Sequence, residues 1–197
     1  KPAPQVSKLS MISLITSLAA LLFILAYPLL FPPPLTGVAF VSNVIDAKWS
    51  SSESLEKGVR RAAGADPIQI IKGIVKIRTD NGVHLVLEAP AEFRFTNSDE
   101  LAMNYGRLFV NVKEASNGFI VQTHKSKIID IGTQFGVYTD MRGETELHVF
   151  EGKTVLIAGL HNRIEQAMDV IAGQARKFGK SLTEAVSYTH LTLPTKR

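Results

Sequence analysis

The chain has 197 residues, no cysteine and a formal net charge of +4. The lack of cysteine excludes disulfides, thiolate metal sites and a cysteine nucleophile. The excess positive charge sits at the two ends of the chain, on Lys1, Lys8, Lys196 and Arg197. The remaining 22 − 4 = 18 basic residues balance the 18 acidic ones. A neutral domain without a basic stripe is a poor nucleic-acid binder, so we expect no nucleic-acid partner.

The first predicted element is an uncharged apolar run at residues 9–31, "LSMISLITSLAALLFILAYPLLF". A helix of this length, at about 1.5 Å per residue, spans the core of a bilayer. Lys1 and Lys8 precede the run and no basic residue follows it before Lys48, so the positive-inside rule places the N-terminus in the cytoplasm. A cleaved signal peptide is the main alternative, but its apolar core normally has only about 7–15 residues. We therefore expect a cytoplasmic stub (1–8), a transmembrane helix (9–31) and a proline-rich linker (32–37).

Residues 38–185 have the turn signals of an extracytoplasmic β-domain. Asn81-Gly82 and Asn117-Gly118 each predict a hairpin turn between two strands. Three more strands follow between residues 127 and 159, with turns expected at 140–143 and at Glu151-Gly152, and a weak strand is expected at 170–178. Helix is predicted only at 50–64 and 162–171. The expected fold is all-β, a short-stranded β-sandwich or a β-solenoid-like domain.

The stretch "DIGTQFGV", residues 130–137, alternates in the manner of a half-buried strand. Its odd positions predict a core face made of Ile129, Ile131, Phe135 and Val137. Two glycines, Gly132 and Gly136, lie on the other face, where glycine normally weakens a strand. The apolar residues occupy odd-numbered positions both before and after Gly132. Crowding by a close neighbour therefore explains the glycines better than a bulge, which would shift the alternation. Asp130 is expected to accept hydrogen bonds from its own strand two residues on or from the Thr133 hydroxyl.

Three ordered motifs, "GFIVQTHKSKIIDIGTQFGVYTD", "ELHVFEGKTVLI" and "AGQARKF", resemble the FecR-type extracytoplasmic domain. The resemblance covers about residues 38–180, and Trp49 is similar to a tryptophan of planctomycete-like members. The residues that match the motifs are Gly118, Phe119, Val121, Asp130, Gly132, Thr133, Phe135, Val149, Glu151 and Gly152.

This resemblance implies a single-pass protein of the bacterial inner membrane, with its C-terminal domain in the periplasm. Such proteins relay an envelope signal to a cytoplasmic sigma factor, as anti-sigma factors or related regulators. The sigma factor would be contacted by a region before Lys1, and an outer-membrane or envelope partner would contact the periplasmic domain. The motif residues are expected to be structural.

No enzymatic constellation is predicted, and we expect no catalytic residue, cofactor or metal. His84, His124 and His148 lack the spacing of metal ligands. Asp130 and Glu151 are a conceivable glycosidase pair, but a turn explains the Glu-Gly corner equally well.

The alternative function is a membrane-anchored module that binds carbohydrate or another envelope polymer. Trp49, Tyr105 and Tyr138 are its candidate stacking platforms. Clustering of these residues on one exposed face would favour binding, and burial of all three would count against it.

The C-terminal segment "VSYTHLTLPTKR", residues 186–197, differs in character from the preceding sequence. It resembles the translation of a transposon-end adapter used in sequencing libraries. We expect this tail to be non-native and to lie outside the core, with the natural sequence cut near Ala185.

Overall fold

The computed structural model describes residues 21–23, 26, 37–50, 55–112, 118–159, 166–179 and 184–185. The chain divides into two compact units, Lys1–Leu35 and Thr36–Arg197. In the first unit, residues 21–23 and 26 are helical. Within the described residues, no helix combines the length and apolar character needed to cross a membrane. The rest of the 9–31 run lies outside the described residues, as does the 186–197 tail, so both expectations stay predictions.

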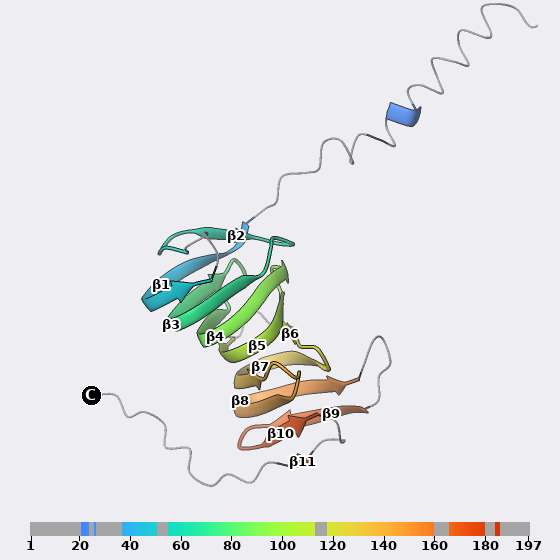
Figure 1. Ribbon diagram of the computed structural model, residues 1–197. Coiled ribbons are helices and arrows are strands. Elements are labelled where there is room, and N and C mark those ends of the chain that lie inside the picture. Colours follow the sequence, from blue (N-terminus) through green and yellow to red (C-terminus); the bar gives the residue numbers. More distant parts are fainter. Residues whose placement is uncertain are drawn as a thin grey trace, which may run out of the picture. The chain divides into compact units, whose positions relative to one another are not determined.

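The second unit is built from strands (Figure 1). Their bounds are β1 (Gly37–Trp49), β2 (Arg60–Ala62), β3 (Ile68–Thr79), β4 (His84–Asn97), β5 (Glu100–Asn111), β6 (Ile120–Gln122), β7 (Ser126–Thr139), β8 (Thr145–Ala158), β9 (Gln166–Ile171), β10 (Ala175–Phe178) and β11 (Glu184–Ala185).

All of these strands belong to one open sheet, in the order β11-β10-β8-β7-β6-β5-β4-β3-β1-β2, with β9 paired to β8. Most neighbours in the sheet are also neighbours in sequence and antiparallel, because tight turns connect them. The all-β prediction is confirmed. The expectation of short strands is wrong, since β1, β3, β4, β5, β7 and β8 have 12–14 residues each.

The long strands contain irregularities near their middles. Register shifts interrupt the pairing of β1 with β3, β3 with β4, β4 with β5 and β7 with β8. One residue with positive φ lies in the central part of each of five long strands: Asp46 in β1, Gly73 in β3, Gly106 in β5, Gly132 in β7 and Gly152 in β8. A bulge adds one residue to a strand and bends it, so each long strand consists of two half-strands.

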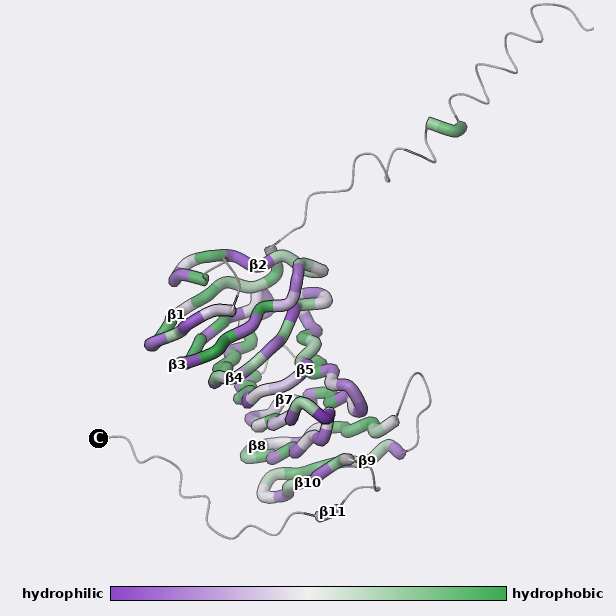
Figure 2. The backbone as a smooth tube through the Cα atoms, viewed as in Figure 1, coloured by the Kyte–Doolittle hydropathy of each residue, from purple (hydrophilic) through white to green (hydrophobic). Residues whose placement is uncertain are grey.

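Each bulge also changes which residues face the core. In β7 the buried positions are even before the bulge (Ser126, Ile128) and odd after it (Phe135, Val137). Both halves contribute to one continuous hydrophobic cluster, so the buried face stays the same while its sequence phase changes. Figure 2 shows hydrophobic and hydrophilic residues interleaved along the strands, as expected when one face is buried.

The phase change corrects the predicted core of β7. Phe135 and Val137 are buried as expected, but Ile129 is only half-buried and Ile131 is 43% exposed. Asp130, which lies between the two isoleucines, is buried instead. The preference for crowding over a bulge at Gly132 was therefore wrong. Gly132 has a φ of 71°, a conformation that glycine adopts without the steric cost of a side chain.

Strand β6 fills a split between β5 and β7. The second half of β5 pairs directly with the second half of β7, Gly106–Asn111 against Gln134–Thr139. In the first half of the two strands, β6 lies between them, parallel to β5 and antiparallel to β7. The hairpin predicted at Asn117-Gly118 is therefore wrong, because a hairpin requires antiparallel neighbours.

The other predicted turns had mixed outcomes. The hairpin at Asn81-Gly82 is confirmed between β3 and β4, where the Gly82 N–H donates to the Thr79 carbonyl at 3.0 Å. The turn at 140–143 is also confirmed, and the Asp140 carboxylate accepts the N–H of Arg142 at 2.9 Å and of Glu144 at 2.8 Å. Glu151-Gly152 is a bulge inside β8, not a turn.

The remaining local predictions fail where short strands replace the expected elements. The predicted helix at 50–64 is wrong from residue 55 onward, where β2 forms. The helix predicted at 162–171 is wrong over Gln166–Ile171, which is β9. The weak strand predicted at 170–178 is divided by a turn at Ala172-Gly173 into the end of β9 and β10.

Candidate functional site

The motif residues meet where β6, β7 and β8 adjoin. Phe119, Val121, Phe135 and Val149 are buried in the core, and so are Asp130 and Thr133. The Gly118 N–H donates to the Asp130 carbonyl at 3.2 Å, and the Asp130 N–H donates to the Phe119 carbonyl at 2.9 Å. The start of β6 is thus tied to β7 beside the β7 bulge.

The Asp130 carboxylate is the polar centre of this region. It accepts the Gly132 N–H at 3.1 Å and the Thr133 hydroxyl, as the sequence predicted, and the backbone of Thr133 and Gly118 also contributes. Burial raises the pKa of Asp130 above its ordinary value, and the hydrogen bonds from Thr133, Gly132 and Gly118 oppose this rise. The hydrogen bonds from Gly132 and Thr133 fix the shape of the bulge, and the one from Gly118 fixes the position of the chain that leads into β6.

The close neighbour expected at Gly132 is a third glycine, Gly152, whereas Gly136 has no such close approach. A Cβ on Gly152 would lie 2.4 Å from the Gly132 carbonyl oxygen and 2.8 Å from the Thr133 Cγ2. A Cβ on Gly136 would lie at ordinary contact distances, 3.4 Å from the Phe150 ring and 3.9 Å from the Leu108 carbonyl oxygen. The bulges of β7 and β8 therefore pack directly on each other. At the surface above them, the Gln134 amide donates to the exposed Glu151 carboxylate at 2.8 Å.

The conceivable Asp130–Glu151 pair does not form a catalytic centre. Asp130 is buried and its oxygens accept hydrogen bonds, whereas Glu151 is exposed and bonds to Gln134. Across the described residues, no group of three or more His, Cys, Asp or Glu side chains is placed to hold a metal ion. The three candidate histidines lie apart: His84 begins β4, His124 is exposed in the loop before β7, and His148 lies beside Glu146 at 3.8 Å.

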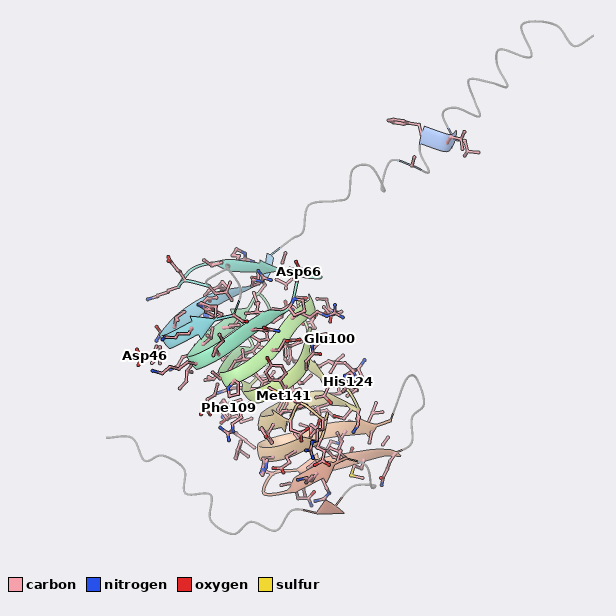
Figure 3. The ribbon with its side chains drawn as sticks, viewed as in Figure 1. Asp46, Asp66, Glu100, Phe109, His124 and Met141 are labelled. Atoms are coloured by element: carbon pink, nitrogen blue, oxygen red, sulfur yellow. The ribbon has the colours of Figure 1, made fainter. Side chains whose placement is uncertain are left out.

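A second candidate region lies on the face of the sheet opposite the core. Two adjoining hollows open there, of about 300 and 620 Å³. The larger one crosses β3, β4, β5, β7 and β8, and the smaller one lies between the β4 and β5 bends and the turn after β7. Arg107 and Tyr138 line both hollows. Figure 3 labels Phe109, which lines the larger hollow, and Met141, which lines the smaller.

Aromatic rings and a glycine form the floor of the larger hollow. Phe109 pairs across strands with Gly136, and Phe150 packs beside Phe109 with ring centroids 5.9 Å apart. Phe150 is 41% exposed and Tyr138 is 39% exposed. The Arg107 guanidinium lies 5.5 Å from the centre of the Tyr138 ring, within the range of a cation–π contact. The sequence reasoning missed Phe109 and Phe150, because it assigned faces by a single alternation that the bulges interrupt.

The three predicted stacking platforms are partly brought together. Tyr105 and Tyr138 line the smaller hollow with Arg107. Trp49 is half-buried against the core cluster and lines neither hollow. Burial raises the pKa of Tyr105, and the nearby Glu92 carboxylate adds to this rise.

The family model described as FecR protein matches residues 68–154, the stretch that contains the split, both bulges and the Asp130 hydrogen bonds. The chain contains a FecR domain. The match takes in β3 to β7 and most of β8, whereas β9 to β11 lie beyond it.

The fold is also similar to two crystal structures of a putative anti-sigma factor from Parabacteroides distasonis ATCC 8503, at 1.65 and 2.50 Å resolution. Each is 20% identical in sequence with a TM-score of 0.50, and the likeness covers 62% and 61% of this chain. The chain spans 58% of the length of each. No curated protein matches the sequence. The FecR domain of this chain thus shares its sheet architecture with these proteins.

Proposed function

We propose that the chain is part of a single-pass, membrane-anchored regulator that relays an envelope signal to a cytoplasmic sigma factor. The observation that carries this proposal is the FecR match over residues 68–154. The similar fold of the anti-sigma factor structures supports it. In this reading the protein acts through binding, not catalysis.

The proposed topology rests on the sequence. The uncharged run at 9–31 follows Lys1 and Lys8 closely and has no basic residue after it before Lys48, which favours residues 1–8 in the cytoplasm and residues 38–185 in the periplasm. The sigma factor would be bound by a cytoplasmic region N-terminal to Lys1. The FecR domain would meet the outer-membrane or envelope partner.

We propose a structural role for the motif residues. Those around Asp130 hold the β6–β7–β8 junction together, and their polar groups are engaged within it. Residues that receive a signal need exposed surface, which the face above β5, β7 and β8 provides.

Two measurements test the proposal. Alkaline phosphatase fused after Ala185 should be active, because that enzyme requires the periplasm, whereas the same fusion after Lys8 should be inactive. In the host, in-frame deletion of residues 38–185 should change transcription of the genes controlled by one sigma factor. An inactive fusion after Ala185 contradicts the topology, and an unchanged transcriptome contradicts the relay.

A further inference from the structure

The two hollows on the outer face form a continuous binding surface. Their shared residues, Arg107 and Tyr138, stand side by side on β5 and β7, where they are cross-strand partners. Volumes of about 300 and 620 Å³ lie within the range of small-molecule sites. A ligand that fills both hollows must therefore extend over Arg107 and Tyr138, which requires more than one ring or unit.

The floor of this surface is largely apolar. Gly136 has no side chain, and the Phe150 ring lies 3.4 Å from the place where its Cβ would be. Phe109 packs beside Phe150, and Val86 continues the apolar floor on β4. The Phe150 and Tyr138 rings are each about two-fifths exposed. Such rings offer faces on which the C–H side of a sugar ring can stack, by the dispersion and electrostatic terms that govern aromatic contacts.

The rim is polar, and the charged groups beside the two stacking rings are paired. Arg107 lies 3.5 Å from Glu88 and over the Tyr138 ring, and Lys177 lies 3.2 Å from Glu146. The Asp140 carboxylate at the smaller hollow accepts backbone N–H groups of the turn. A charged ligand that binds Arg107 or Glu146 would have to break one of these pairs. A ligand with uncharged hydroxyl groups can donate to the carboxylates of Glu88 and Glu146 and accept from Arg107 without separating them.

We propose that this surface of the FecR domain, made of Val86, Arg107, Phe109, Gly136, Tyr138 and Phe150, is a binding site for a neutral oligosaccharide of at least two sugar units. The apolar faces of the sugar rings stack on Phe150 and Tyr138, and their hydroxyls meet the rim formed by Glu88, Arg107 and Glu146. This goes beyond the relay, because the site needs neither a sigma factor nor a particular membrane topology to bind.

The test uses the full chain in lipid nanodiscs on an array of neutral and anionic oligosaccharides, followed by calorimetry with the best neutral binder. Tyr138→Ala and Phe150→Ala each remove one stacking ring and should weaken binding at least tenfold. Gly136→Val retains both aromatic residues but adds methyl groups beside the Phe150 ring in the floor, and it should also abolish binding. The backbone tolerates valine, because φ at Gly136 is not positive and a Cβ there would lie at ordinary contact distances, 3.4 Å from the Phe150 ring and 3.9 Å from the Leu108 carbonyl oxygen.

The matched control is Ile171→Ala, which removes an exposed apolar side chain from β9, outside both hollows. It should leave affinity unchanged, and thermal unfolding shows that each variant is folded. The absence of any neutral binder overturns the proposal, as does a binder that is insensitive to Gly136→Val. Binding of anionic glycans alone, or of an extended peptide in place of sugar, overturns it as well. Loss of the transcriptional response with glycan binding intact would reject the relay and leave this site standing.

Discussion

The Asp130 junction and the outer hollows lie on opposite faces of the sheet. They differ in whether their side chains are buried and bonded within the protein or exposed to solvent. At the junction, a buried carboxylate accepts hydrogen bonds from β7 and from Gly118, which precedes β6, and the bulges of β7 and β8 touch. In the hollows, the Tyr138 and Phe150 side chains are partly open to solvent. The residues that match the family motifs are concentrated at the junction, whereas none of them lines either hollow, although Gly136, Tyr138 and Phe150 lie within the motif stretches. A family motif therefore need not coincide with a binding site.

The largest effect should come from filling the contact between the bulges. Gly152→Val combines a φ of 76° with a Cβ 2.4 Å from the Gly132 carbonyl oxygen. Backbone strain of about 1–3 kcal/mol and overpacking of about 1–3 kcal/mol predict a loss of roughly 2–6 kcal/mol in a denaturant titration. Gly173→Val is the matched control, with a φ of 81° and no atom within 4 Å. Equal losses in the two variants would show that the bulge contact is unimportant.

Truncation of a core residue on β7 should be almost as costly. Phe135→Ala removes a fully buried ring and should lower the free energy of unfolding by about 3–5 kcal/mol. Ile131→Ala, four positions earlier, truncates a side chain that is 43% exposed and should cost less than about 1 kcal/mol. The urea midpoints of the two variants show which of these two β7 residues faces the core, and so test the change of alternation at the bulge. A large loss for Ile131→Ala would restore the simple odd-face alternation.

Asp130 should give the junction a dependence on pH. Its pKa is raised in the folded state, so its contribution to stability is complete below the unfolded pKa of about 4 and is lost as pH rises through the folded pKa. The stability of the wild type relative to Asp130→Asn should therefore fall as pH rises from about 4. Unfolding titrations across this range measure the difference, with the exposed Asp169→Asn as control. A difference that grows with pH would mean that the hydrogen bonds outweigh burial.

The smallest effect is expected on the outer face. Tyr138→Ala should change the free energy of unfolding by no more than about 0.5–1 kcal/mol, because the ring is exposed and its contact with Arg107 is a surface one. Thermal or urea unfolding checks this value. A loss comparable to that of Phe135→Ala would remove the contrast between the two regions and assign Tyr138 to the fold.

Local sequence signals predicted much of the architecture. β-Branched and aromatic runs separated by Asn-Gly and Asp-x-x-Gly signals led to an all-β fold, and the turns at 81–82 and 140–143 form as predicted. The hydrogen bonds of Asp130 to Gly132 and Thr133 were also predictable, because their partners lie two and three residues away. The ordered motifs were sufficient to recognise the FecR domain.

The bulges, the place of β6 and the outer hollows were decided by tertiary structure. In β7, isoleucines occupy positions 128, 129 and 131, so both alternation phases look apolar until the pairing with β8 selects one. Glu151-Gly152 resembles a hairpin corner in sequence, and only the register of β7 against β8 makes it a bulge. Phe109, Gly136 and Phe150 come from β5, β7 and β8. They lie close together because of the register of β5 against β7 and of β7 against β8. Local propensity acts over a few residues, whereas strand pairing sets phase and face between residues far apart in the chain.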